Sequence, residues 1–209
     1  MDVEFSRTGE RRYAVTVRRQ DDSVLQMSPA AGFDPLIPHD LVHLVVESEL
    51  GLRLGVFGQI AAGGTAGTFH ELRPDTGDRR ETARRRRRQA QRGEALLRAG
   101  RSDAERSERA AAACLRFWME RRAARGRRPG PGAQRRGPGG SLGREAARAE
   151  AGVTEEQLRR ICEHFDRLSD IWAGLAVGEA LTVGWPLRDP AADEGATCHV
   201  DWGTTLEAG

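Results

Sequence analysis

The sequence predicts an α+β domain in which a small antiparallel sheet packs on three or four helices. Residues 3–27 alternate apolar and polar side chains, which is typical of half-buried strands. Two later segments, 38–50 and 154–176, carry apolar residues at helical spacing. Between them, the Arg-rich segment 79–140 is expected to interrupt the domain as a partly disordered excursion. Its composition, rich in arginine and alanine, favours helix up to about residue 125, and the glycine- and proline-rich residues 126–140 favour disorder.

Three short strands are expected near the N-terminus, at residues 3–5, 12–18 and 24–27. Polar segments suited to turns separate them, so the pattern favours an antiparallel meander. A further strand at residues 181–185 precedes Pro186 and can complete the same sheet.

A buried helix is expected to begin at Pro38 and end at Gly51, the usual residue for a left-handed cap. Asp40, His43 and Glu47 form a polar strip along it, and His39 lies at the edge of this strip. Apolar residues occupy most of the remaining circumference, so this helix should be packed on nearly all sides; they are Leu41, Val42, Leu44, Val45, Val46 and Leu50.

Two more helices follow. One covers residues 107–125 and is expected to dock through Cys114, Phe117 and Trp118. The other opens at Thr154, three residues before Gln157, which is the spacing of a capping box. We therefore expect a single domain over residues 1–186, interrupted at 79–140, with a linker at 126–140 and a flexible acidic tail at 187–209.

Charge is distributed unevenly along the chain. Residues 79–140 hold 20 arginines against six acidic residues, whereas the rest holds 13 arginines against 25 acidic residues. The chain contains no lysine and no asparagine, which indicates a GC-rich coding sequence that inflates arginine. The chain resembles small proteins of GC-rich bacteria, a likeness that implies no activity.

The three cysteines are far apart and form no Cys-x-x-Cys pair, which argues against a disulfide framework and a thiolate zinc site. No apolar run has the length of a membrane span or the character of a signal peptide. We expect a cytoplasmic protein without a membrane partner.

His39 and His43 are the strongest candidates for functional residues, as ligands of a metal ion. Four residues apart on a helix, their Cβ atoms lie about 5–6 Å apart, close enough to share a metal ion. Residues 39–43, His-Asp-Leu-Val-His, resemble the His-Glu-x-x-His helix of the zincin metallopeptidases, with Asp in place of Glu. The resemblance implies a divalent metal such as zinc, held by His39 and His43, with Asp40 as the base that activates water.

A third metal ligand must come from elsewhere, because none follows at a motif spacing. Glu47 lies about 12 Å along the helix axis from His39, so we expect it to support His43 rather than bind the ion. His164 on the C-terminal helix is the preferred candidate, followed by His70 and Glu71.

Three classes of function follow, and the sequence does not decide whether the protein is an enzyme. The first is a non-catalytic interaction or structural domain, in which Asp40 is an ordinary acid near a helix start and His43 pairs with Glu47. The second is a metal-dependent hydrolase. The third is an accessory protein that binds a polyanion such as nucleic acid through its arginine run, which consists of Arg84, Arg85, Arg86, Arg87 and Arg88.

Overall fold

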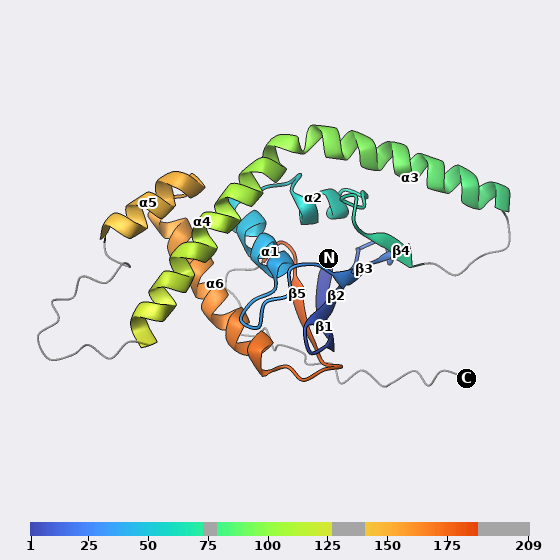
Figure 1. The fold of residues 1–209 in the computed structure, drawn as a ribbon. Helices are drawn as coiled ribbons and strands as arrows, with labels where there is room; N and C mark the ends of the chain where they lie inside the picture. The colour runs from blue at the N-terminus through green and yellow to red at the C-terminus, as the bar shows by residue number, and fades with distance from the viewer. Residues whose placement is uncertain (73–78, 127–140, 188–209) are drawn as a thin grey trace, which may run out of the picture.

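The computed structural model describes residues 1–72, 79–126 and 141–187. The linker expected at 126–140 and the tail expected at 187–209 therefore lie almost entirely outside the described residues. The described residues confirm the α+β class and form a five-stranded antiparallel sheet with six helices (Figure 1). In chain order the elements are β1 Asp2–Gly9, β2 Arg12–Arg18, β3 Val24–Ala30, α1 His39–Leu50, α2 Val56–Ala61, β4 His70–Leu72, α3 Arg79–Ala99, α4 Arg101–Gly126, α5 Ser141–Ala151, α6 Glu155–Gly174 and β5 Ala180–Gly184.

The sheet has the strand order β4-β3-β2-β1-β5. The strand expected near the C-terminus is present as β5, and it pairs with β1 so that Val3 lies opposite Val183. The edge strand β4 was not expected, because three residues are too few to show an alternating pattern. Trp172 of α6 packs edge-on against Tyr13 of β2, with ring centroids 5.9 Å apart, so α6 covers the sheet at this point.

Helix α1 begins one residue later than expected and ends where expected. Pro38 is its N-cap residue, and Gly51 closes it in the left-handed conformation with φ 63°. All residues from Leu41 to Glu47 are buried, including both polar ones, because α1 lies between the sheet and α4 (Figure 1). The polar strip of α1 therefore faces other elements of the protein instead of water.

The helices α2 and α5 were not expected. Residues 56–61 form the short helix α2. Helices α3 and α4 meet at Gly100, where a Cβ atom would lie 2.4 Å from the Leu54 carbonyl oxygen. Part of the Arg-rich segment belongs to the core, since Cys114 and Trp118 of α4 are fully buried. No helix among the described residues is long and apolar enough to cross a membrane.

Helix α6 begins with the expected capping box. The Thr154 hydroxyl accepts the Gln157 N–H, and the Gln157 side chain accepts the Thr154 N–H. Two donors at the exposed start of the helix are satisfied by this exchange.

We expect Thr154→Ala to lower the free energy of unfolding by about 1 kcal/mol, because the cap oxygen is lost while its surroundings are unchanged. Thr154→Ser keeps the oxygen and should stay close to the wild type. Urea denaturation followed by circular dichroism measures both. Equal stabilities of the alanine and serine variants would contradict the capping role.

Candidate metal centre

Helices α1 and α4 bring together two histidines and one carboxylate. The Nε2 atom of His43 lies 3.3 Å from Nε2 of His39 and 3.7 Å from Oε2 of Glu108. One ligand atom from each of the three residues lies within 4.8 Å of the others. Among the described residues, no other group of three or more His, Cys, Asp or Glu side chains brings its ligand atoms this close together.

The two imidazoles meet because they stand one turn apart on α1, with ring centroids 4.5 Å apart. The loop before α1 fixes the first of them. The N–H of His39 donates to the Gly32 carbonyl oxygen, and a Cβ atom on Gly32 would lie 2.6 Å from the Cβ atom of His39. Since Gly32 also has a φ of +75°, glycine is required for this close approach.

The separation of the two nitrogens fits a shared ion. Two nitrogens bound to zinc at about 2.0–2.1 Å with a tetrahedral angle between them lie about 3.3 Å apart. The observed 3.3 Å between His39 and His43 agrees with this value. The 3.7 Å between His43 and Glu108 is a few tenths of an ångström longer than this value, and the ligand atom of Glu108 lies within 4.8 Å of the one of His39. A shared ion therefore requires the Glu108 side chain, which is 68% exposed, to move toward His39.

A chain of hydrogen bonds behind His43 sets its tautomer. The Ser107 hydroxyl donates to Oε1 of Glu47 at 3.0 Å, so its oxygen is left to accept the Nδ1–H of His43 at 2.8 Å. The neutral ring then has its lone pair on Nε2, the atom that faces His39 and Glu108. A partner that holds one ring nitrogen protonated in this way orients metal-binding histidines.

Glu47 is itself held by the start of α2. Its two carboxylate oxygens accept the N–H groups of Val56 at 2.8 Å and Phe57 at 3.0 Å. Two backbone donors and one hydroxyl thus converge on a side chain with no exposed surface. As expected from the sequence, Glu47 supports His43 rather than joining the ligand atoms, although it does so through Ser107.

Burial shifts the pKa values of both residues toward the neutral forms. It lowers the pKa of His43 to about 4, with a further reduction from His39 and an opposing effect of Glu108. The same cause raises the pKa of Glu47 to about 7, against the effect of its hydrogen-bond donors. At neutral pH, His43 is therefore an uncharged imidazole able to bind a cation.

Asp40, expected as the catalytic base, lies elsewhere. Its Oδ2 atom accepts a 2.5 Å hydrogen bond from the Tyr13 hydroxyl, and burial raises its pKa. The carboxylate thus attaches α1 to β2 and is not among the clustered ligand atoms. Its role as a base remains a prediction without support from this arrangement.

His164, the expected third ligand, is also outside the group. It is buried on α6, where Nε2 lies 3.3 Å from Oε1 of Glu49 and Nδ1 lies 3.1 Å from Nη2 of Arg167. Both ring nitrogens already face other partners. The alternatives His70 and Glu71 lie on β4 and are not in the group either.

Glu108 and Ser107 were missed by the sequence analysis. Ser107 precedes Cys114 by seven residues and Trp118 by eleven, so it lies on the same face of α4. Since this face was expected to dock on the rest of the protein, the burial of Ser107 could have been predicted. A polar residue on a docked face indicates a buried hydrogen bond. Glu108 gave no such signal, because an exposed glutamate on a helix is common.

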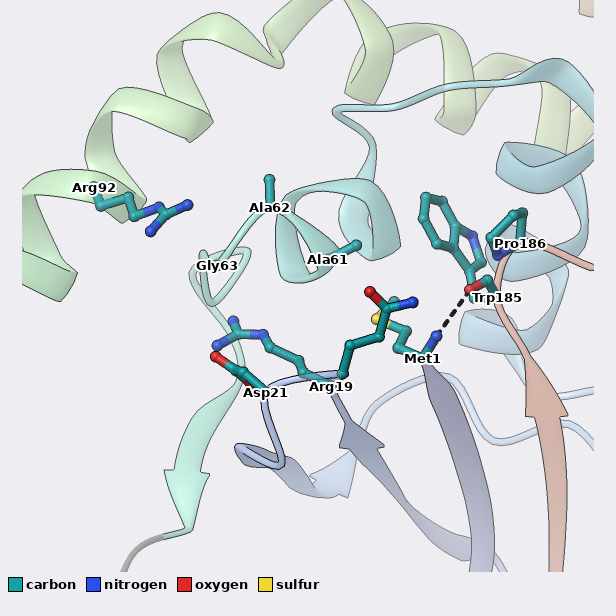
Figure 2. Close-up of a pocket in the computed structure, with 10 residues that line it drawn as sticks. Met1, Arg19, Asp21, Ala61, Ala62, Gly63, Arg92, Trp185 and Pro186 are labelled. Carbon is teal, nitrogen blue, oxygen red and sulfur yellow. Dashed lines mark hydrogen bonds between the residues drawn. The ribbon is translucent and has the colours of Figure 1, made fainter.

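A separate cavity of about 360 Å³ lies beside the start of β1, and Arg19, Arg92 and Trp185 contribute to its lining (Figure 2). The Arg19 guanidinium donates to the Ile60 carbonyl oxygen at 2.7 Å and to the Gly64 carbonyl oxygen. It is therefore used to hold the turn after α2. None of His39, His43 and Glu108 lines this cavity.

We expect Gly55→Ala to lower the free energy of unfolding by about 2–3 kcal/mol, because a methyl group would displace the Glu47 carboxylate from its donors. A Cβ atom at Gly55 would lie 2.3 Å from Cδ of Glu47, whereas one at Gly174 would meet nothing within 4 Å. Gly174→Ala is therefore the matched control and should change stability by less than about 0.5 kcal/mol. Urea denaturation distinguishes them, and equal effects would contradict this placement of Glu47.

Replacement of Glu47 by glutamine should change how stability depends on pH. The pKa of Glu47 is raised from 4.5 to about 7, so its contribution to stability is fully present below pH 4.5 and is lost as the pH rises through 7. Glutamine cannot ionise. The stability of the wild type relative to Glu47→Gln should therefore fall by about 3 kcal/mol between pH 4.5 and 7.

Thermal or urea unfolding of both proteins across this pH range measures the difference. The opposite contribution of His43, whose lowered pKa favours the folded state at higher pH, is present in both proteins and largely cancels. A constant difference from pH 4.5 to 7 would contradict the burial of an ionisable carboxyl here.

The chain matches no protein-family model, no curated protein and no solved structure. The resemblance of residues 39–43 to the zincin helix is thus confined to five residues. The candidate ligand set is defined by side-chain geometry alone.

Proposed function

We propose that the protein binds a divalent transition-metal ion through His39, His43 and Glu108 and acts as a metal-dependent hydrolase. The observation that carries this proposal is the position of the Glu108 carboxylate, 3.7 Å from a histidine nitrogen that bears a lone pair. Two electron-rich atoms that face each other at this distance are stabilised by a cation between them.

The alternative is a hydrogen-bonded pair of histidines without metal. A proton on Nε2 of His39 could be donated to Nε2 of His43 and would also account for their 3.3 Å separation. That arrangement provides nothing to attract Glu108 to His43, since the pKa of His43 is lowered to about 4 and the ring is uncharged at neutral pH. A shared cation would attract the Glu108 carboxylate and both imidazole nitrogens to one point.

The donor set favours catalysis over a purely structural ion. Catalytic zinc sites commonly use three protein ligands, such as two histidines and a glutamate, and leave one position for water or substrate. His39 and Glu108 are exposed, so the free positions would face solvent. When bound, the ion would supply Lewis-acid activation of a water molecule. The same donor set also suits iron(II), and metal titrations distinguish the two.

The experiment is metal binding to protein prepared without a histidine tag. Calorimetric titration with Zn²⁺, and elemental analysis after dialysis, should give one ion per chain. His39→Ala, His43→Ala and Glu108→Gln should each weaken binding at least tenfold, because three ligands then become two. Circular dichroism should show that the variants that lose binding keep the helix content of the wild type.

Glu105→Gln is the matched control, since Glu105 is an exposed glutamate on the same helix, three residues before Glu108, and outside the ligand group. It should bind zinc as the wild type does. Equal binding by Glu105→Gln and Glu108→Gln, or absence of a stoichiometric ion, would refute the metal site and leave a non-catalytic domain. Metal binding without hydrolysis of activated esters or phosphodiesters would refute only the catalytic part.

A further inference from the structure

Helix α3 carries a concentration of positive charge that the metal centre does not use. Its 21 residues include nine arginines and two glutamates. Figure 1 shows α3 extending away from the sheet, with its C-terminal end next to α4. That end is packed, since Cβ atoms on Gly63 and Gly64 would lie within 3 Å of Arg92 and Leu96. The N-terminal half carries the arginine run.

Four arginines of this run have no counter-charge in the described part of the chain. Arg84, Arg86, Arg87 and Arg88 are exposed, and none of them forms a hydrogen bond or an ion pair with another side chain there. The helices α4, α5 and α6 differ, because their arginines are widely paired with acidic residues. Acidic side chains thus neutralise many arginines of α4, α5 and α6, but not Arg84, Arg86, Arg87 and Arg88 of α3.

Unpaired like charges one turn apart destabilise a helix. Arg84 and Arg88 form such a pair, so α3 has repulsion that a bound polyanion would relieve. Five consecutive arginines at 100° per residue also surround the helix with charge instead of forming one stripe. A ligand with phosphates on both sides of the helix uses this distribution better than a flat surface does.

The composition of this half also favours one class of polyanion. Residues 79–95 contain no large apolar side chain, so α3 has nothing to insert into a membrane interface. They contain no aromatic residue on which unpaired bases could stack. An α-helix about 10–12 Å across fits the major groove of B-DNA, which is about 12 Å wide and bordered by two phosphate strands.

We propose that α3 is a docking helix for duplex DNA, and that Arg84, Arg86, Arg87 and Arg88 contact the phosphate backbone without reading sequence. This function is independent of the metal centre. Binding of this kind releases counterions, so the logarithm of the binding constant should fall with the logarithm of salt concentration by about 0.9 for each phosphate contacted.

The experiment is fluorescence anisotropy of a labelled 20-base-pair duplex of random sequence, titrated with the full chain between 50 and 200 mM salt. The quadruple variant of these four residues to glutamine, which keeps helix propensity, should weaken binding at least tenfold at 50 mM salt. It should also reduce the salt slope by about 3 to 4. The corresponding lysine variant retains the charge and should bind nearly as the wild type does.

A matched control removes the same charge elsewhere, by changing four exposed, paired arginines to glutamine; these are Arg116, Arg122, Arg144 and Arg159. This control should retain the affinity and the slope. If both glutamine variants lose the same affinity, binding depends on the net charge of the protein and not on α3, and the proposal is overturned. Tighter binding to single-stranded DNA, or to phosphatidylserine vesicles but not duplex, would also overturn it. Glu108→Gln should bind DNA normally, which separates this test from that of the metal centre.

Discussion

The hydrogen bonds that converge on the buried Glu47 carboxylate position most of the features described above. Glu47 lies near the C-terminal end of α1. Its oxygens accept N–H groups from Val56 and Phe57 at the start of α2 and the hydroxyl of Ser107 on α4. Burying a carboxylate costs several kcal/mol unless hydrogen bonds compensate for lost water. The three donors provide that compensation only in one relative placement of α1, α2 and α4. The same placement brings Glu108 of α4 to the histidines of α1.

Burial has opposite consequences for the two titratable groups of this network. Water is excluded from both, which lowers the pKa of His43 to about 4 and raises that of Glu47 to about 7. The result at neutral pH is an imidazole without a proton on the atom that faces His39. His39 and Glu108, by contrast, lie at the surface. An ion at this place would be held by one buried ligand and two exposed ones, with solvent on its open side.

The fold was largely predictable from the sequence, and the third ligand was not. Alternation located the strands near the N-terminus, and the Pro38–Gly51 pair gave the limits of α1 to within a residue. The histidine pair followed from helical spacing alone. Spacing cannot indicate which residue of a distant helix lies opposite, so His164 was chosen because it bordered an apolar stripe. Its buried position is instead explained by contacts with Glu49 and Arg167. Asp40 was assigned from the motif, but the Tyr13 hydroxyl holds it on the side of the sheet.

The most direct test of the metal centre is the position of an ion in crystals of the full chain grown with Zn²⁺, located by anomalous diffraction at the zinc edge. The proposed ligand set requires one strong peak about 2.0–2.2 Å from Nε2 of His39, from Nε2 of His43 and from a carboxylate oxygen of Glu108. It also requires the Ser107 hydroxyl to remain between His43 and Glu47. Absence of a peak at this group, with the two imidazoles hydrogen-bonded to each other and Glu108 turned to solvent, would contradict the central claim.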